Sequence, residues 1–217
     1  MTQQASKLRW ILIALLFTLY AAVRISTAPS IVDKPRVLAD TTAYERISRY
    51  DILSHDLWMA SRPPIFPLLL KAAQQDFDRA AALQLGLAIP AWGLLALMIS
   101  RTFARPALQI GGFGLVLLFS LERHIAGWDF VMMSESLSVT TMVLFLAACL
   151  WLLEGWRTLR FISVLIAASL LAFSRDTNAW MLLALAVMIA AAVAVRWTRA
   201  RALWLAAGLV LIFVLSD

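Results

Sequence analysis

The apolar run WILIALLFTLYAAV, residues 10–23, decides the class of fold. Lys7 and Arg9 precede the run and Arg24 follows it. A helix that crosses the roughly 30 Å hydrocarbon core of a bilayer needs about 20 mainly apolar residues. The run is long for the apolar part of a secretory signal peptide, and only a weak cleavage site follows it. We therefore predict a retained first membrane span over 9–27.

Further apolar runs follow the first, and each of them indicates a helix, because backbone polar groups in lipid must be satisfied within the segment. The remaining predicted spans are 80–100, 106–121, 133–153, 160–174, 179–195 and 203–216. Hydrophobic residues make up 62% of the 217 residues, well above the share in globular domains. The sequence predicts an all-α polytopic membrane protein with about seven transmembrane helices, which form a single module over 1–217.

The charges give an orientation. The net charge is +6, yet the basic residues lie in short clusters between apolar runs, which argues against a nucleic-acid partner. One set of connecting segments carries a single acid, Glu154, and nine basic residues: Lys7, Arg9, Arg101, Arg105, Arg157, Arg160, Arg196, Arg199 and Arg201. Short cytoplasmic segments are rich in Lys and Arg, so we expect a cytoplasmic N-terminus in a bacterial inner membrane and an active face outside.

The first outer segment, 28–79, is the longest polar stretch of the chain. Thr41 or Thr42 can cap a short helix that continues through Tyr44 to Leu53. A second piece, Ile-Phe-Pro-Leu-Leu-Leu at 65–70, follows Arg62-Pro-Pro and is too short to span a bilayer. We expect both pieces to be interfacial helices on the outer membrane surface.

Two residues of this segment are candidates for chemistry. Asp40 can accept a proton from a hydroxyl group or hold a divalent cation; alternatively it only caps the following helix. Arg62, held by two prolines at the membrane surface, can grip a phosphate with two parallel hydrogen bonds. The alternative for Arg62 is a simple anchor that reaches toward lipid headgroups.

Other outer segments add further candidates. Asp129 and Glu135 lie at the outer mouth of the predicted span 133–153, where acids are costly unless they are paired or functional; they are candidates for acceptor or metal binding. Arg175 can join Arg62 in holding an anion, while Asp176 or Thr177 caps the next helix. His55 can titrate near neutral pH but has no metal-ligand spacing to another histidine or cysteine. Cys149 is the only cysteine, so no disulfide follows.

The order of these elements resembles the GT-C membrane glycosyltransferases, which include protein O-mannosyltransferases and the lipid A aminoarabinose transferase. The resemblance rests on Asp40 with Tyr44, on RPPIFPLLL at 62–70, on SESL at 134–137 and on SRD at 174–176. It implies a conserved membrane module that further helices and an outer soluble part usually follow. The C-terminal part of a typical family member is therefore expected to be absent from these 217 residues.

The resemblance also implies a reaction. A polyprenyl-phosphate sugar donor enters from the lipid bilayer, Arg62 and Arg175 hold its phosphate, and Asp40 deprotonates an acceptor hydroxyl on a glycan, lipid or protein. Transfer inverts the anomeric carbon. The family usually has paired acids at the position of Asp40, whereas Thr41 occupies the second place here and Glu45 is the nearest substitute.

Two other functions stay open from the sequence. A lipid-linked carrier or flippase would use the same arginines to hold a headgroup, although few polar residues line the predicted spans. A non-catalytic membrane subunit would use the outer loop to dock a partner. No P-loop, GxSxG, HExxH or dinucleotide-binding fingerprint occurs, so nucleotide-powered chemistry and zinc proteolysis have no support.

Overall fold

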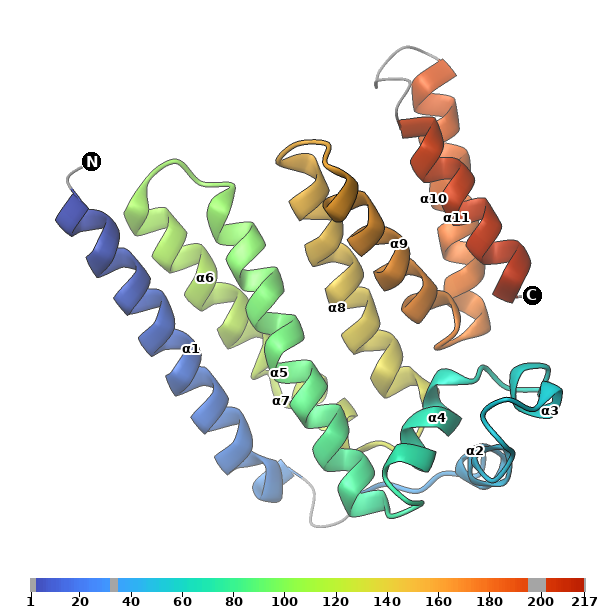
Figure 1. Cartoon of the computed structure of the whole chain (residues 1–217). Coiled ribbons are helices and arrows are strands. Elements are labelled where there is room, and N and C mark those ends of the chain that lie inside the picture. Colours follow the sequence, from blue (N-terminus) through green and yellow to red (C-terminus); the bar gives the residue numbers. More distant parts are fainter. Residues whose placement is uncertain (1–2, 32–34, 195–201, 217) are drawn as a thin grey trace.

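The computed structural model describes residues 3–31, 35–194 and 202–216, and it is helical throughout these ranges apart from its connections (Figure 1). One isolated parallel bridge, between Arg36 and Val131, is the β-type pairing that they contain. The helices are α1 (Gln3–Ile31), α2 (Thr41–Ser48), α3 (His55–Trp58), α4 (Ile65–Ala72), α5 (Phe77–Arg101), α6 (Pro106–Ser120), α7 (Arg123–Gly127), the 3₁₀ helix η1 (Trp128–Phe130), α8 (Ser134–Leu153), α9 (Thr158–Ala172), α10 (Asp176–Ala194) and α11 (Ala202–Ser216).

Each apolar run of the sequence lies in one helix, and several of these helices are long enough to cross a membrane. Four segments of the described chain meet that requirement by length and composition: Lys7–Ala28, Phe77–Arg101, Ser134–Leu153 and Asp176–Ala194. A fifth is possible by length if α6 and Arg123–Phe130 count together, although they meet at a bend of 54°. Helices α9 and α11 are apolar but have only 15 residues each. The chain is thus all-helical with four or five potential spans among its described residues.

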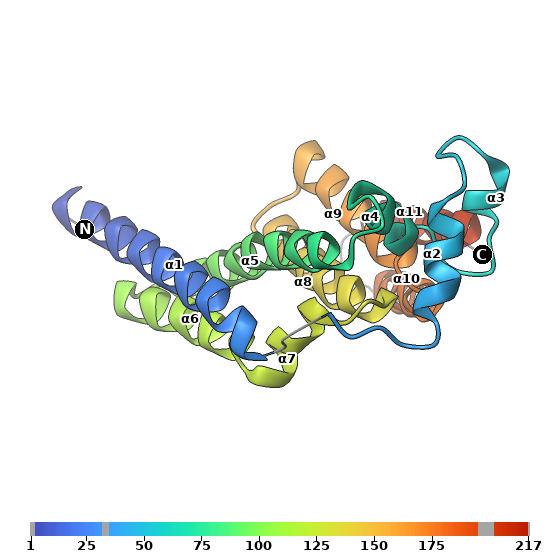
Figure 2. The same cartoon turned by 90° about the horizontal axis from the view of Figure 1, so that it is seen from below.

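The long helices run alternately in opposite directions, so the connections gather at two ends (Figure 1). We call the end with the N-terminus and the α5–α6 and α8–α9 connections the turn end. The opposite end, which carries α2, α3, α4 and α7, is the loop end. Figure 2 shows α2, α3 and α4 together beneath the half of the bundle that contains α8 to α11. Three of the predicted cytoplasmic arginines, Arg196, Arg199 and Arg201, lie outside the described residues.

Helix α8 contributes to all three apolar cores of the bundle. Its Phe145 packs with α9, α10 and α11, its Val143 packs with α1, α5 and α6, and its Leu137 packs with the loop-end residues Tyr44 and Phe66. The two halves of the bundle therefore meet on one helix.

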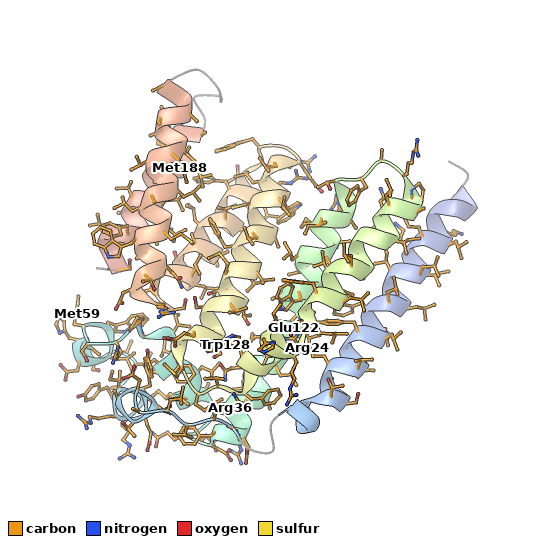
Figure 3. The ribbon with its side chains drawn as sticks, turned by 180° about the vertical axis from the view of Figure 1, so that it is seen from behind. Arg24, Arg36, Met59, Glu122, Trp128 and Met188 are labelled. Atoms are coloured by element: carbon orange, nitrogen blue, oxygen red, sulfur yellow. The ribbon has the colours of Figure 1, made fainter. Side chains whose placement is uncertain are left out.

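The outer surface of the bundle is largely apolar. Leucines on α1 and α6 and a methionine on α10 are more than half exposed: Leu15, Leu19, Leu118 and Met188 (Figure 3). Large apolar side chains spread over several helices would be costly in water but cost nothing in lipid. The surface supports the membrane environment that the composition predicts.

A buried ion pair joins α1 to η1 near the loop end. Arg24 and Asp129 are only 2% and 4% exposed, and Arg24 Nη2 lies 2.8 Å from Asp129 Oδ2. A second nitrogen, Nη1 of Arg24, donates to the carbonyl of Ser120 at the end of α6. Gln84 of α5 donates to the carbonyl of Asp129 at 3.2 Å. Four elements are thus connected through one buried cluster of charges and amides.

The chain after α1 is fixed to the segment before α8. Arg36 donates its N–H to the carbonyl of Phe130 at 2.7 Å and accepts from the N–H of Met132 at 3.0 Å. Thr41 Oγ1 donates to the carbonyl of Met132 at 2.8 Å. These bonds hold the start of α2 against the start of α8.

The sequence predicted a helix through Leu53, but α2 ends at Ser48. After it, the chain turns: Asp51 Oδ1 accepts from the N–H of Leu53, and Ser54 caps the short helix α3. The predicted cap at Thr41 or Thr42 is also wrong by position, because Asp40 is the residue that precedes α2. Local side-chain bonds to the backbone compete with continuation of the helix here.

Breaking the buried pair should destabilise the bundle. Asp129→Asn leaves Arg24 without its counter-charge, and loss of one partner of a buried pair costs about 3 to 5 kcal/mol of unfolding free energy. Arg49→Gln is the control, because the Arg49–Glu45 pair is exposed and such pairs contribute about 0 to 1 kcal/mol. Denaturant unfolding of the purified protein in detergent measures both variants; equal effects would contradict the role given to Arg24.

Candidate functional site

A pocket of about 250 Å³ at the loop end brings together most of the residues singled out from the sequence. Its wall comes from the start of α2, the segment before α4, the start of α8 and the connection between α9 and α10. The residues that line it are Asp40, Tyr44, Arg62, Pro63, Ser134, Glu135, Arg175, Asp176 and Thr177. We call it the loop-end pocket.

Two ion pairs cross the loop-end pocket. Arg62 Nη2 lies 2.9 Å from Asp40 Oδ1, and Arg175 Nη2 lies 3.2 Å from Glu135 Oε1. The side chains of Asp40, Arg62 and Arg175 are about two-fifths to one-half exposed, whereas Glu135 is 21% exposed. All four charges therefore remain accessible to a ligand while they neutralise one another.

Asp40 does not act as a side-chain cap. It has helical backbone angles, φ −72° and ψ −19°, and its carboxylate makes no capping hydrogen bond to α2. Its oxygen faces Arg62 instead. The missing side-chain hydrogen bond argues against the alternative that the Asp40 carboxylate merely caps the helix. The carboxylate lines the loop-end pocket.

Tyr44 forms the inner wall of the pocket, one turn after Asp40 on the same face of α2. Its ring is 3% exposed and meets the ring of Phe66 edge-on, with centroids 5.0 Å apart. Its hydroxyl donates to Ser134 Oγ at 2.9 Å, and Ser134 in turn donates to Glu135 at 3.3 Å. Burial raises the pKa of the Tyr44 phenol above its ordinary value, so the phenol stays protonated and a donor at neutral pH.

Arg62 is positioned by its surroundings on two sides. Its guanidinium carbon lies 6.0 Å from the centroid of the Tyr44 ring, within the range of a cation–π contact. The two prolines that follow it precede α4, and Ile65 of that helix donates its N–H to the carbonyl of Phe173 at 3.3 Å. This bond ties the Arg62 segment to the end of α9, so Arg62 and Arg175 face the same pocket.

The turn that carries Arg175 is held by a small polar network between α8 and α10. Asn178 donates to Ser138 at 2.8 Å and to Ser174 at 3.1 Å. Ser174 and Thr141 lie within 3.3 Å of each other. All of these groups are buried or half-buried, so the network fixes the direction in which Arg175 leaves the turn.

Three other candidates lie elsewhere. Asp129 is in the buried pair with Arg24 and does not line the loop-end pocket. Glu45 pairs with Arg49 at 2.7 Å on the exposed side of α2. His55 lines a separate pocket of about 360 Å³ between α2 and α3. These positions give Asp129 a structural environment and leave Glu45 a poor substitute for a second acid beside Asp40.

The sequence singled out Asp176 and Thr177 only as caps of the next helix, and it did not single out Pro63 as a site residue. All three line the loop-end pocket. Their positions in the sequence, directly after Arg62 and Arg175, could have identified them as residues of the site. Asp176 adds a third acid, so the charged side chains of the pocket carry a formal charge of −1, from two arginines and three carboxylates.

The sequence left metal binding open for the acids at this end of the bundle. In the part of the chain that the structure describes, no three His, Cys, Asp or Glu side chains are grouped closely enough to hold a metal ion. Asp40 and Glu135 each direct an oxygen at an arginine rather than at each other. The described residues therefore offer no preformed group of three metal ligands at this pocket.

Comparisons with known proteins give no relative: no protein-family model, curated protein or solved structure matches this chain.

Two substitutions of Tyr44 should separate the stability contributed by its hydrogen bond to Ser134 from that contributed by its ring packing on Phe66. Tyr44→Phe removes only the hydrogen bond to Ser134 and should cost about 0.5 to 1.5 kcal/mol of unfolding free energy. Tyr44→Ala also removes the ring packed on Phe66 and should cost about 3 to 5 kcal/mol. Tyr50→Phe, at a partly exposed site, should have little effect. Unfolding in detergent gives the three values, and equal losses for Phe and Ala at position 44 would refute this division.

Proposed function

We propose that this chain is the membrane module of a glycosyltransferase that moves a sugar from a polyprenyl phosphate to an acceptor hydroxyl at the outer face of a bacterial inner membrane. The observation that carries the proposal is the loop-end pocket. It joins Asp40, Arg62, Glu135 and Arg175, although these residues belong to separate segments of the chain. The same residues carry the resemblance to GT-C enzymes.

The two arginines suit the phosphate of the donor. A guanidinium binds phosphate through paired hydrogen bonds, and Arg is the preferred residue for such contacts at partly buried sites. Arg62 and Arg175 enter the pocket from different segments, so together they can hold a phosphodiester from two directions. Each must first give up its carboxylate partner, because Arg62 is paired with Asp40 and Arg175 with Glu135.

That exchange links donor binding to catalysis. When the phosphate takes Arg62, the carboxylate of Asp40 is released from its ion pair and can accept a proton. The acceptor hydroxyl then gives its proton to Asp40 while its oxygen attacks the anomeric carbon of the sugar. The bond from that carbon to the phosphate oxygen breaks, and the electron pair leaves with the polyprenyl phosphate. Attack opposite the leaving group inverts the anomeric configuration.

The remaining side chains of the pocket have supporting roles in this scheme. The Tyr44 ring, which faces the Arg62 guanidinium, keeps that group near the pocket when Asp40 releases it. Glu135, hydrogen-bonded by Ser134, can accept from a sugar hydroxyl once Arg175 moves to the phosphate.

The membrane arrangement is part of the same proposal. All seven apolar helices of more than ten residues (α1, α5, α6, α8, α9, α10 and α11) cross the bilayer, and the loop end faces outward. The 15 residues of α9 and α11 give helices of about 22 Å, shorter than the hydrocarbon core of roughly 30 Å. Such short spans require local thinning of the bilayer. The arginines at the turn end support an inward turn end under the positive-inside rule.

The test of the reaction is Asp40→Asn, made in the full natural protein in native membranes. Transfer from polyprenyl-phosphate mannose or aminoarabinose should fall by about 10² to 10⁴ because the proton acceptor is lost. Binding of polyprenyl phosphate should persist, since both arginines remain. Asp56→Asn, an exposed acid of the same outer segment, is the control and should leave transfer unchanged.

Other outcomes would count against the proposal. Undiminished transfer by Asp40→Asn would remove that residue as the base. If the unsubstituted protein moved polyprenyl phosphate across the bilayer of proteoliposomes without transferring any sugar, the carrier function would replace it.

The orientation can be tested separately with alkaline phosphatase, which is active only outside the cytoplasm. Fusions after Tyr50, Gly127 and Arg175 should be active, and fusions after Phe103 and Trp156 should be inactive. The Arg175 fusion also tests whether the short helix α9 crosses the membrane. The reverse pattern would overturn the inward N-terminus.

A further inference from the structure

Two arginines border a small pocket at the turn end, far from the loop-end pocket. The turn-end pocket has a volume of about 340 Å³ and is lined by Arg9, Trp10, Ile13, Ser100, Arg101 and Gln109. The lining contains two positive charges and no acid. It lies among α1, α5 and α6, where the sequence predicted a cluster of basic residues.

Arg9 has a donor that the protein does not use. Its Nη1 donates to Gln109 Oε1 at 2.7 Å, but its Nε is buried and has no hydrogen-bond partner among the described residues. A buried N–H without an acceptor is unfavourable, and more so when it belongs to a charged group. The guanidinium carbon of Arg9 also lies 4.8 Å from the centroid of the Trp10 ring.

Arg101 also has a surplus of charge. Its Nε lies 2.9 Å from Glu154, but Arg160 shares the same carboxylate at 3.3 Å. Two guanidinium groups therefore face one acid. With Arg9 included, the three arginines and Glu154 leave a formal charge of +2 at this end of the bundle, which favours an anion there.

An apolar groove adjoins the same arginine. It has a volume of about 430 Å³ and lies between α5, α8 and α9. Arg101 and Ser163 are the polar residues of its wall; the others include Met98, Leu144, Ala148, Trp151 and Ile166. Arg101 lines both the groove and the turn-end pocket. A charged rim thus stands next to a long apolar surface.

We propose that this site binds one anionic phospholipid of the cytoplasmic leaflet. The phosphate lies between Arg9 and Arg101, the two cations that line the turn-end pocket, and one acyl chain lies in the groove. Trp10 and Trp151 sit at the level of the headgroups, as indole rings commonly do at membrane interfaces. The inference rests on the membrane orientation proposed above but does not depend on glycosyl transfer.

A lipid explains the observations better than free phosphate does. Inorganic phosphate would satisfy the arginines but would leave the groove between α5, α8 and α9 without a ligand. A phospholipid can occupy both the turn-end pocket and the groove, since its phosphate and its acyl chain are joined in one molecule. The net positive charge further selects anionic headgroups over zwitterionic ones.

The test uses the purified chain in nanodiscs that contain phosphatidylglycerol and phosphatidylcholine, with the retained lipids counted by native mass spectrometry. The unsubstituted protein should retain one phosphatidylglycerol in preference to phosphatidylcholine. Arg9→Gln and Arg101→Gln should each lower that retention roughly fivefold, the effect expected for one basic residue at an anionic surface. Arg9→Lys should keep much of it because the charge remains.

Two matched variants test the alternatives. The first tests whether anionic lipid is retained by general attraction to positive charge, and the second tests whether the arginines bind a free anion without the groove. Arg123→Gln removes the same charge at the exposed loop end and should leave retention unchanged. Ala148→Phe fills the groove, keeps all the arginines and should also lower retention.

Three results would overturn the proposal: equal retention by Arg9→Gln and Arg123→Gln, no preference for phosphatidylglycerol in the unsubstituted protein, or displacement of the lipid by millimolar inorganic phosphate. Because the second and third use the unsubstituted protein, the proposal stays testable if a variant fails to fold. Undiminished transfer by Asp40→Asn, with lipid retention intact, would refute only the proposed reaction.

Discussion

The buried pair of Arg24 and Asp129 is the constraint on which the loop end depends. Two opposite charges that are almost fully shielded from water must remain together, because either one alone would be strongly unfavourable there. Their contact sets where η1 lies against α1. The backbone that continues from η1 then bonds Arg36 and Thr41, and this places Asp40 beside the start of α8. The carboxylate of Asp129, which does not line the loop-end pocket, thereby helps to position Asp40, the residue that we propose as the base.

Much of this architecture could be predicted from the chain because lipid imposes simple rules. Apolar runs of suitable length had to be helices, and each of them is. The alternation of helices also predicted that the segments with Asp40, Arg62, Glu135 and Arg175 would share one end of the bundle, as they do. The number of membrane crossings does not follow from the apolar pattern alone, because helices as short as α9 and α11 have the same pattern without the usual length of a span.

Pairwise contacts were beyond the reach of the sequence. Arg24 resembled an ordinary flanking charge at the end of an apolar run, and nothing in its neighbourhood pointed to Asp129, which lies 105 positions further along the chain. The same holds for the pairing of Asp40 with Arg62, where the expected cap of α2 gave way to a longer-range ion pair. Charge pairs of this kind depend on how helices pack, and packing is not encoded in local periodicity.

The position of α8 has a mechanical consequence. This one helix carries Glu135 at the loop-end pocket and Leu144, Ala148 and Trp151 in the wall of the apolar groove near the turn end. An α-helix of 20 residues is a stiff rod, so an axial shift or rotation at one of its ends is carried to the other. In the membrane orientation that we propose, a change at the inner leaflet can therefore alter the geometry of the loop-end pocket at the outer leaflet through this one helix.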